Sequence, residues 1–388
     1  MFLIKKKYAL YFFLIFPFIK PGLFEYIPLI DNLYNVMRIF SFAYIMTAYY
    51  KKMFRNKLFI VIFLFEMISL LGTIIEGGNI LRWLMTAAIN ISAIAITFIW
   101  AEDDLYSYIR IVGKYINILL LINLIGIMIY PNGIISTSAG GCNFLDIDNL
   151  MFPFLLFSVL LNGYAIYLNV YSKLAAIIFI CIALITPILV MCGTAIMAFA
   201  AAVIVFMVFG RKHSKELANP KMLFIIFIVL FVLVVCVQNI NIVSSFVTQV
   251  LGKSITLSGR IYIWNDFFRY IRSKTFNLFV GTGVRDGYYF YSPSFFQDVH
   301  PHNQILYVLL ENGFLGLMVW LYTNFMCIKH WRMTNEKISL LTSTLYFTFL
   351  ICMLGEVFRN NFFFFGILTL MYLISNGMLA INNTERNK

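Results

Sequence analysis

The chain has 388 residues, of which 62% are hydrophobic and only 12% are charged, and its formal net charge is +12. A soluble domain carries roughly twice this charged fraction, so the composition excludes an ordinary soluble protein and predicts a membrane protein. Only helices and closed barrels satisfy their backbone in lipid, and the apolar runs here do not alternate. We therefore expect an all-α polytopic membrane protein.

Hydrophobic stretches recur along the whole chain and predict about 12 transmembrane helices. They lie near residues 8–19, 33–50, 58–75, 80–100, 109–130, 150–168, 173–191, 193–209, 222–239, 304–327, 338–356 and 361–379. The first stretch follows three lysines, as a signal peptide would, but no small-residue cleavage site comes after it. We therefore expect it to remain as a helix.

The positions of lysine and arginine predict the orientation in the membrane. If the N-terminus is cytoplasmic and twelve spans alternate, most basic residues fall on the cytoplasmic side, and the C-terminus is cytoplasmic too. This arrangement forms a single membrane domain, with helices one to nine in residues 1–239, an extracytoplasmic loop in 240–303 and helices ten to twelve in 304–388. No long basic soluble segment remains, so we expect no nucleic-acid partner.

The loop at 240–303 is basic on the side where basic residues should be rare. Its cations are Lys253, Arg260, Arg269, Arg272, Lys274 and Arg285. One interpretation is that a loop of this length escapes the positive-inside rule. The other is a site for an anionic ligand at the membrane surface.

Residues 258–273 of this loop predict an amphipathic helix in the outer interface, with Ser258 as its N-cap. The apolar positions Ile261, Trp264, Phe268 and Ile271 follow helical spacing. Arginines on the other side would approach lipid phosphates or be solvated. The glycine-rich segment 281–287 that follows either exposes amides to a phosphate or forms a turn.

The tetrapeptide His300-Pro301-His302-Asn303 opens the tenth hydrophobic stretch and holds two of the four histidines. Imidazole titrates near neutrality and can take a proton from a sugar hydroxyl. A polar helix cap without chemistry is the alternative. Glu66 and Glu311 lie inside predicted spans, where a carboxylate serves either function or hydrogen bonding between helices.

Three segments together resemble the signature of the O-antigen polymerase and O-antigen ligase superfamily. They are SGRIYIW at 258–264, VGTGV at 280–284 and HPHNQILYVLLENGFLGLMVW at 300–320. Nine residues separate Asn303 from the Gly313-Phe314-Leu315-Gly316 segment, as in the family pattern. The resemblance agrees with the number of spans and with the position of the long loop.

The resemblance implies a GT-C-like glycosyltransferase of the bacterial inner membrane that works at the periplasmic face. It would be inverting and would use no metal and no cofactor. Donor and acceptor would be glycans on undecaprenyl pyrophosphate, surrounded by membrane lipid, and a chain-length regulator protein would be a further partner.

The resemblance also implies roles for single residues. His302 would be the catalytic base that activates the acceptor hydroxyl. Arginine suits the pyrophosphate through its paired donors, and the candidates are Arg260, Arg285, Arg82 and Arg38. Residues on the acceptor side or in support of His302 would be Asn303, Glu311, His300 and Arg359.

Two positions bear on the type of reaction. Family members often carry a Ser-Arg pair where this chain has Gly193-Thr194-Ala195, so the pyrophosphate clamp would use another arginine. Ligases, which transfer the glycan to a lipid A core, often have Thr where Leu317 stands, and this favours a polymerase. A glycolipid transporter or flippase is the alternative from another class, but it requires neither the basic loop nor the His-Asn helix start.

Overall fold

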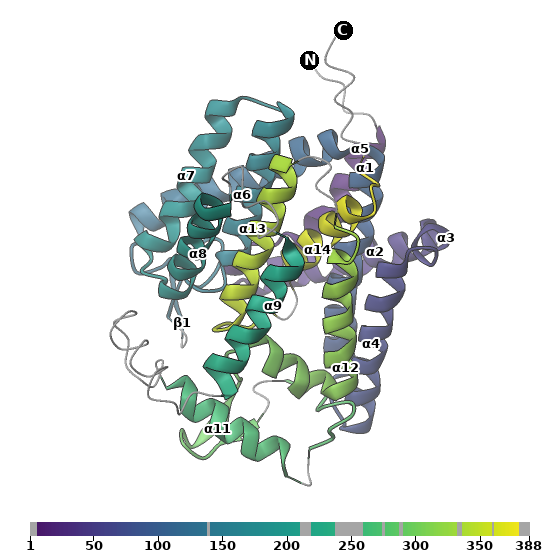
Figure 1. Cartoon of the computed structure of the whole chain (residues 1–388), viewed down its shortest axis with the longest axis vertical. Coiled ribbons are helices and arrows are strands. Elements are labelled where there is room, and N and C mark those ends of the chain that lie inside the picture. The colour runs from purple at the N-terminus through teal and green to yellow at the C-terminus, as the bar shows by residue number, and fades with distance from the viewer. Residues whose placement is uncertain are drawn as a thin grey trace.

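The computed structural model describes residues 6–137, 140–209, 219–236, 259–273, 276–286, 290–331, 336–358 and 361–379. This part of the chain is all-α apart from two antiparallel hairpins, β1 (Ile135–Thr137) with β2 (Gly140–Cys142) and β3 (Phe290–Ser292) with β4 (Gln297–Val299). The α-helices are α1 (Lys6–Ile15), α2 (Pro28–Ala48), α3 (Tyr50–Met53), α4 (Lys57–Ile75), α5 (Ile80–Ile129), α6 (Phe152–Leu168), α7 (Lys173–Leu189), α8 (Gly193–Phe209), α9 (Pro220–Phe231), α11 (Arg260–Ile271), α12 (Gln304–Ile328), α13 (Glu336–Met353) and α14 (Phe362–Ser375) (Figure 1).

The described helices fit a membrane-embedded protein. Among them, α4, α5 and α12 are long and apolar enough to cross a membrane, and α6, α7, α8, α9, α13 and α14 are shorter apolar helices. Large apolar side chains remain exposed along these helices, for example Leu64 and Leu71 of α4 and Met318 of α12. Such a surface is unsuited to water and suited to lipid. The count of twelve spans and the division at residues 239 and 303 stay predictions.

Two predicted spans are joined in α5, which runs for 50 residues. Asp104 interrupts it with a non-helical backbone (φ −159°, ψ 93°), between the stretches expected at 80–100 and 109–130. The Asp104 carboxylate accepts a hydrogen bond from the amide of Ser107, as an N-cap does for a new helix. The first predicted span is shorter than expected, because α1 ends at Ile15 and a 3₁₀ turn containing Pro17 follows it.

The glycine-rich segment joins the loop before α12 to two helices, α4 and α12. α12 is broken at Gly313, which has a φ of +64°. Near this break, the amides of Thr282 and Gly283 donate to the carbonyls of Leu310 and Glu311 at 2.8 and 2.9 Å. A Cβ on Gly283 would lie 2.2 Å from the backbone nitrogen of Thr73 in α4, so only glycine fits there. Because these amides are already donated, they favour the interpretation of this segment as a structural turn.

α11 is the amphipathic helix that the sequence predicts, although Ser258 lies outside the described residues and Gly259 occupies the N-cap position. Its buried face contains Ile263, Trp264 and Phe267, which pack with both the β3–β4 hairpin and the first turns of α12. All four residues of the predicted stripe contact this cluster, with Ile261, Phe268 and Ile271 partly buried, and Ile263 and Phe267 extend the buried face. Figure 1 shows α11 lying across the lower end of the bundle.

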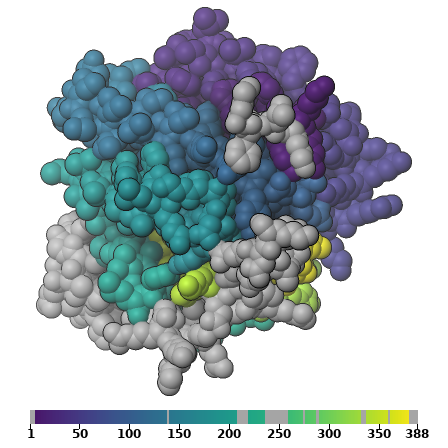
Figure 2. Space-filling view, turned by 90° about the horizontal axis from the view of Figure 1, so that it is seen from above, coloured from purple at the N-terminus to yellow at the C-terminus, as the bar shows by residue number. Residues whose placement is uncertain are grey.

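The opposite end of the bundle is seen in Figure 2. There the early helices, in purple and blue, cover one side and the middle segments, in teal, cover the other. Among the helices, α4 packs on α12, α14 on α5, and α13 on α8. These pairings bring segments that are distant in the sequence into contact.

Candidate active site

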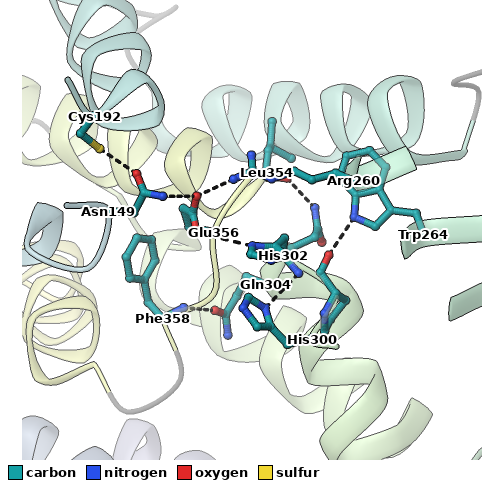
Figure 3. A network of polar contacts seen from close by, with 12 residues as sticks. Asn149, Cys192, Arg260, Trp264, His300, His302, Gln304, Leu354, Glu356 and Phe358 are labelled. Atoms are coloured by element: carbon teal, nitrogen blue, oxygen red, sulfur yellow. Dashed lines mark hydrogen bonds and ion pairs between the residues drawn. The ribbon is translucent and has the colours of Figure 1, made fainter. Parts of the chain in front are cut away.

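A buried carboxylate lies at the centre of the candidate site. Glu356 follows α13, and its side chain is 6% exposed. Its Oε1 atom accepts hydrogen bonds from Arg260 Nη2 at 2.6 Å and from Asn149 Nδ2 at 2.9 Å. Its Oε2 atom lies 3.9 Å from Nδ1 of His302. One carboxylate thus brings a predicted anion-binding arginine and the predicted base together (Figure 3).

The packing of α11 determines where Arg260 lies. Arg260 is the first residue of α11, and Trp264 lies one turn later on the same face. The Trp264 side chain is 1% exposed, and its Nε1 donates to the carbonyl of Pro301 at 2.8 Å. Since Pro301 directly precedes His302, this bond fixes α11, which carries Arg260, against the segment that carries His302.

The backbone of His302 has an unusual conformation. Its φ is +46°, in the left-handed region that residues other than glycine rarely adopt. The imidazole is one-third exposed, and its Nδ1 has no hydrogen-bond partner among the described residues. Strain of this kind concentrates at functional sites, where it aims a side chain. The geometry leaves the ring accessible and close to Glu356.

The ring of His300 packs against that of His302 at a tilt of 39°. The two ring centroids are 3.8 Å apart, and Nδ1 of His300 accepts a hydrogen bond from the amide of His302 at 3.2 Å. Burial lowers the pKa of His300 to about 4, with help from the nearby His302 and Arg260 charges and against the effect of Glu356. His300 is therefore neutral near pH 7 and supports His302 by contact.

Asn303 and Gln304 tie the start of α12 to the segment that carries Glu356. Asn303 Oδ1 accepts from two amides in the first turn of α12 at 3.0 and 3.1 Å, and its Nδ2 donates to the carbonyl of Leu354 at 3.0 Å. Gln304 Oε1 accepts from the amide of Phe358 at 2.8 Å. Asn303 is fully buried by these contacts. Both ends of its amide are used in positioning.

Asn149 and Cys192 belong to the site but were missed in the sequence. The Cys192 thiol donates to Asn149 Oδ1 at 2.8 Å, which turns the Asn149 Nδ2 toward Glu356. Neither residue stands in a recognisable motif. Glu356 also stands in no recognisable motif, although a carboxylate at the end of an apolar stretch is itself a signal of function.

The absence of a side chain at Gly355 leaves room for the guanidinium of Arg260. A Cβ at position 355 would lie 2.6 Å from Nη1 of Arg260. Since φ of Gly355 is not positive, an alanine there meets no backbone penalty, and only the end of the flexible arginine must move. The position therefore controls where the guanidinium lies.

Two other predicted arginines lie in a separate cavity of about 630 Å³. Arg82 Nη1 pairs with Asp286 at 3.2 Å, while Arg38 donates to the carbonyl of Pro17 at 2.9 Å. The cavity wall comes from the segment before α2, from α2 itself and from the starts of α5, α6 and α14. The structure does not bring these arginines into contact with Glu356.

Arg285 and Glu311 are also placed apart from Glu356. Arg285 pairs with Glu76 at 3.3 Å near the start of α5. Glu311 accepts from the hydroxyl of Tyr307 and shares a small buried cavity of about 20 Å³ with Glu66. Arg359 lies outside the described residues. The roles predicted for Arg38, Arg82, Arg285, Glu311 and Arg359 stay predictions.

A metal site would bring several His, Cys, Asp or Glu side chains together. The described residues contain no group of three or more His, Cys, Asp and Glu side chains that could hold a metal ion. Metal-independent chemistry stays a prediction from the family resemblance.

Comparison with known proteins gives one match. Residues 175–321 match the sequence profile of a family described as O-Antigen ligase. The matched range covers α7 to most of α12, and so includes Arg260, His300 and His302. No curated protein and no solved structure matches the chain.

Proposed function

From the family match, which supports membership of the O-antigen ligase and polymerase superfamily, we propose that this chain is a polymerase. It would join repeat units carried on undecaprenyl pyrophosphate by inverting glycosyl transfer at the periplasmic face. The single observation that carries the proposal is the convergence of Arg260 and His302 on the carboxylate of Glu356, at 2.6 and 3.9 Å. A phosphate-binding cation and a base in one partly open site suit this reaction.

His302 acts as the base in the proposed reaction. The acceptor hydroxyl attacks the anomeric carbon of the donor sugar while its proton passes to the Nε2 of the imidazole. Glu356 lies close enough to Nδ1 to hold the ring, and a hydrogen bond that is long without substrate can tighten when substrate binds. The carboxylate then stabilises the imidazolium that forms, as an aspartate does in serine hydrolases.

Arg260 binds the leaving group. The bond between the anomeric carbon and the pyrophosphate oxygen breaks, and its electron pair leaves with the lipid pyrophosphate. Preorganised positive charge at this point stabilises the transition state. Glu356 and Gly355 hold the guanidinium in place, so its remaining N–H groups can donate to phosphate oxygens in pairs.

A ligase is the second candidate, because the matched family is described as O-Antigen ligase. Both reactions need the same base and the same leaving-group contact, and they differ in the acceptor. A polymerase transfers the growing chain to another lipid-linked repeat unit, and a ligase transfers it to a lipid A core sugar. Leu317 favours the polymerase.

The purified protein in lipid nanodiscs tests the two functions against each other. It should be given lipid-linked repeat units alone, and then repeat units with a core-lipid acceptor. A ladder of longer chains from repeat units alone supports the polymerase. Product that forms only when the core lipid is present would contradict the polymerase and support the ligase. No transfer under either condition would contradict both proposed functions.

We also propose that α11 and the β3–β4 hairpin face the periplasm, with both termini in the cytoplasm of a bacterial inner-membrane protein. Gln297 in the hairpin and Lys51 in α3 are both exposed. In a background whose six cysteines are replaced, Gln297→Cys should react with a membrane-impermeant reagent in spheroplasts and Lys51→Cys should not. The reverse result contradicts the orientation. A chain-length regulator stays a proposed partner.

A further inference from the structure

The cavity that contains Arg38 and Arg82 lies beside the candidate active site. Its volume of about 630 Å³ falls within the roughly 300–1,000 Å³ that is usual for ligand sites. The two regions meet at the start of α6, where Asn149 binds Glu356 and the next residue, Leu150, lines the cavity. The two regions are therefore adjacent at this point of the fold.

The charges that line this cavity are largely paired with one another. Lys20 is almost fully buried and binds Asp31 at 2.5 Å and Glu25 at 3.1 Å. Arg82 binds Asp286, which also accepts from Asn79 at 2.8 Å. An anion entering the cavity would meet cations that already have carboxylate partners, together with the repulsion of those carboxylates.

The remaining two charged groups complete this balance. Arg38 contributes positive charge beside the amide of Asn35, to which it donates at 3.2 Å. Asp146 contributes the opposing carboxyl group, and burial together with nearby Glu25 raises its pKa to about 7. Near neutral pH the lining therefore carries little net charge, although it is rich in polar atoms.

Paired charges of this kind suit a ligand whose groups both donate and accept hydrogen bonds. A sugar hydroxyl donates to a carboxylate and accepts from a guanidinium, whereas a pyrophosphate only accepts. Aromatic side chains such as Phe154 and Phe363 form the apolar part of the wall, and their electron-rich faces suit the C–H surface of a sugar ring.

We propose that this cavity binds uncharged sugar units of the lipid-linked substrate, while the pyrophosphate lies at Arg260. The assignment rests on the proposed function. Under this assignment, Arg38 and Arg82 donate hydrogen bonds to sugar hydroxyls. The charge of the repeat unit then becomes a determinant of specificity.

Binding of the sugar without its lipid tests the assignment independently of any transfer activity. The probe is the oligosaccharide released by mild acid from the source cells' own lipid-linked repeat units, titrated into the full-length protein in nanodiscs. Leu150→Trp places an indole in the cavity from a half-exposed position and should remove measurable binding. Asp286→Asn removes one charged acceptor from an exposed pair and should weaken binding roughly tenfold.

Inorganic pyrophosphate provides the contrasting ligand. It should not compete with the oligosaccharide, and its own binding should be unchanged in Leu150→Trp and Arg82→Gln but weakened in Arg260→Gln. Competition by pyrophosphate, or normal oligosaccharide binding by a folded Leu150→Trp protein, would overturn the assignment. If transfer assays fail while these binding results hold, the proposed function is wrong and the sugar site remains.

Transfer kinetics then separate the two sources of sugar. With a long-chain donor and a single-unit acceptor labelled differently, Leu150→Trp should raise the KM of one of them. A rise for the acceptor assigns the cavity to the acceptor glycan, and a rise for the donor assigns it to the donor glycan. Unchanged KM values for both would contradict a sugar site.

Discussion

Two regions of this molecule carry arginines that the sequence offers equally as pyrophosphate ligands, and they differ in what holds each cation. At the candidate active site, Arg260 is fixed by α11, lies against Gly355 and shares the carboxylate of Glu356 with His302. In the neighbouring cavity, Arg82 pairs with an exposed aspartate, and the described residues that line this cavity include carboxylates but no histidine. The comparison teaches that the groups around an arginine, more than its charge, decide which part of a substrate it can bind.

The largest expected effect comes from removing the base. His302→Asn should lower turnover by roughly 10²–10⁴-fold, because the acceptor hydroxyl loses its proton acceptor. Asn accepts the left-handed backbone at this position better than Ala does, so folding should survive. The measurement is polymer length on a gel together with the single-turnover rate, in nanodiscs.

His330→Asn is the matched control for the base, since His330 is exposed and lies just beyond the end of α12. It should leave the rate unchanged, and donor affinity should be nearly normal in both variants. Normal polymer from well-expressed His302→Asn would leave the histidine as part of a structural helix start. The base would then be sought at Glu356.

Replacing Arg260 with lysine should have the next largest effect. The charge is kept but the paired N–H donors are lost, so the rate should fall by roughly 10²-fold. Arg269→Lys in the same helix is the control, because that side chain is 75% exposed and pairs only with Asp266 among the described acidic groups. Equal losses in the two variants would remove Arg260 from the site.

Gly355→Ala displaces the guanidinium without changing its chemistry. A methyl group at this position would lie within 2.6 Å of the Arg260 Nη1, so the arginine must shift and the rate should fall roughly tenfold. In an Arg260→Ala background the same change should have no further effect. Additive losses in the double variant would indicate that Gly355 acts on the fold and not through Arg260.

The smallest expected effect is on acid stability. Because the pKa of His300 is lowered from 6.5 to about 4, the folded protein binds fewer protons there than the unfolded chain does between these values. Stability from this group is therefore present above pH 6.5 and is lost as the pH falls toward 4. His300→Gln should flatten the fall of melting temperature over this window, and an unchanged slope would contradict the buried, neutral state of His300.

Much of the helical architecture could be predicted from the sequence, because long apolar runs indicate membrane helices. The start of α12 at Gln304 and the position of α11 follow from local patterns, namely a capping asparagine and an amphipathic period. The break at Gly313 could not be predicted, since it depends on amides of the 281–283 turn that reach α12 only in the folded chain.

The candidate active site was predictable only in part, for a similar reason. Arg260 and His302 stand in recognisable motifs, and their segments meet as expected. Asn149, Cys192 and Gly355 stand in none, because they act through contacts between segments distant in the chain. The sequence also could not rank its four candidate arginines, since burial and carboxylate partners are properties of the fold.

The most direct test of the two-region account is to locate the phosphorus atoms of a bound donor. The inactive His302→Asn protein can be imaged by electron cryomicroscopy with a lipid-linked repeat unit bound. The account predicts phosphate oxygens within about 3 Å of the Arg260 guanidinium, with sugar density extending past Leu150 into the cavity. Phosphate density beside Arg38 and Arg82, with Arg260 left in contact with Glu356 alone, would contradict it.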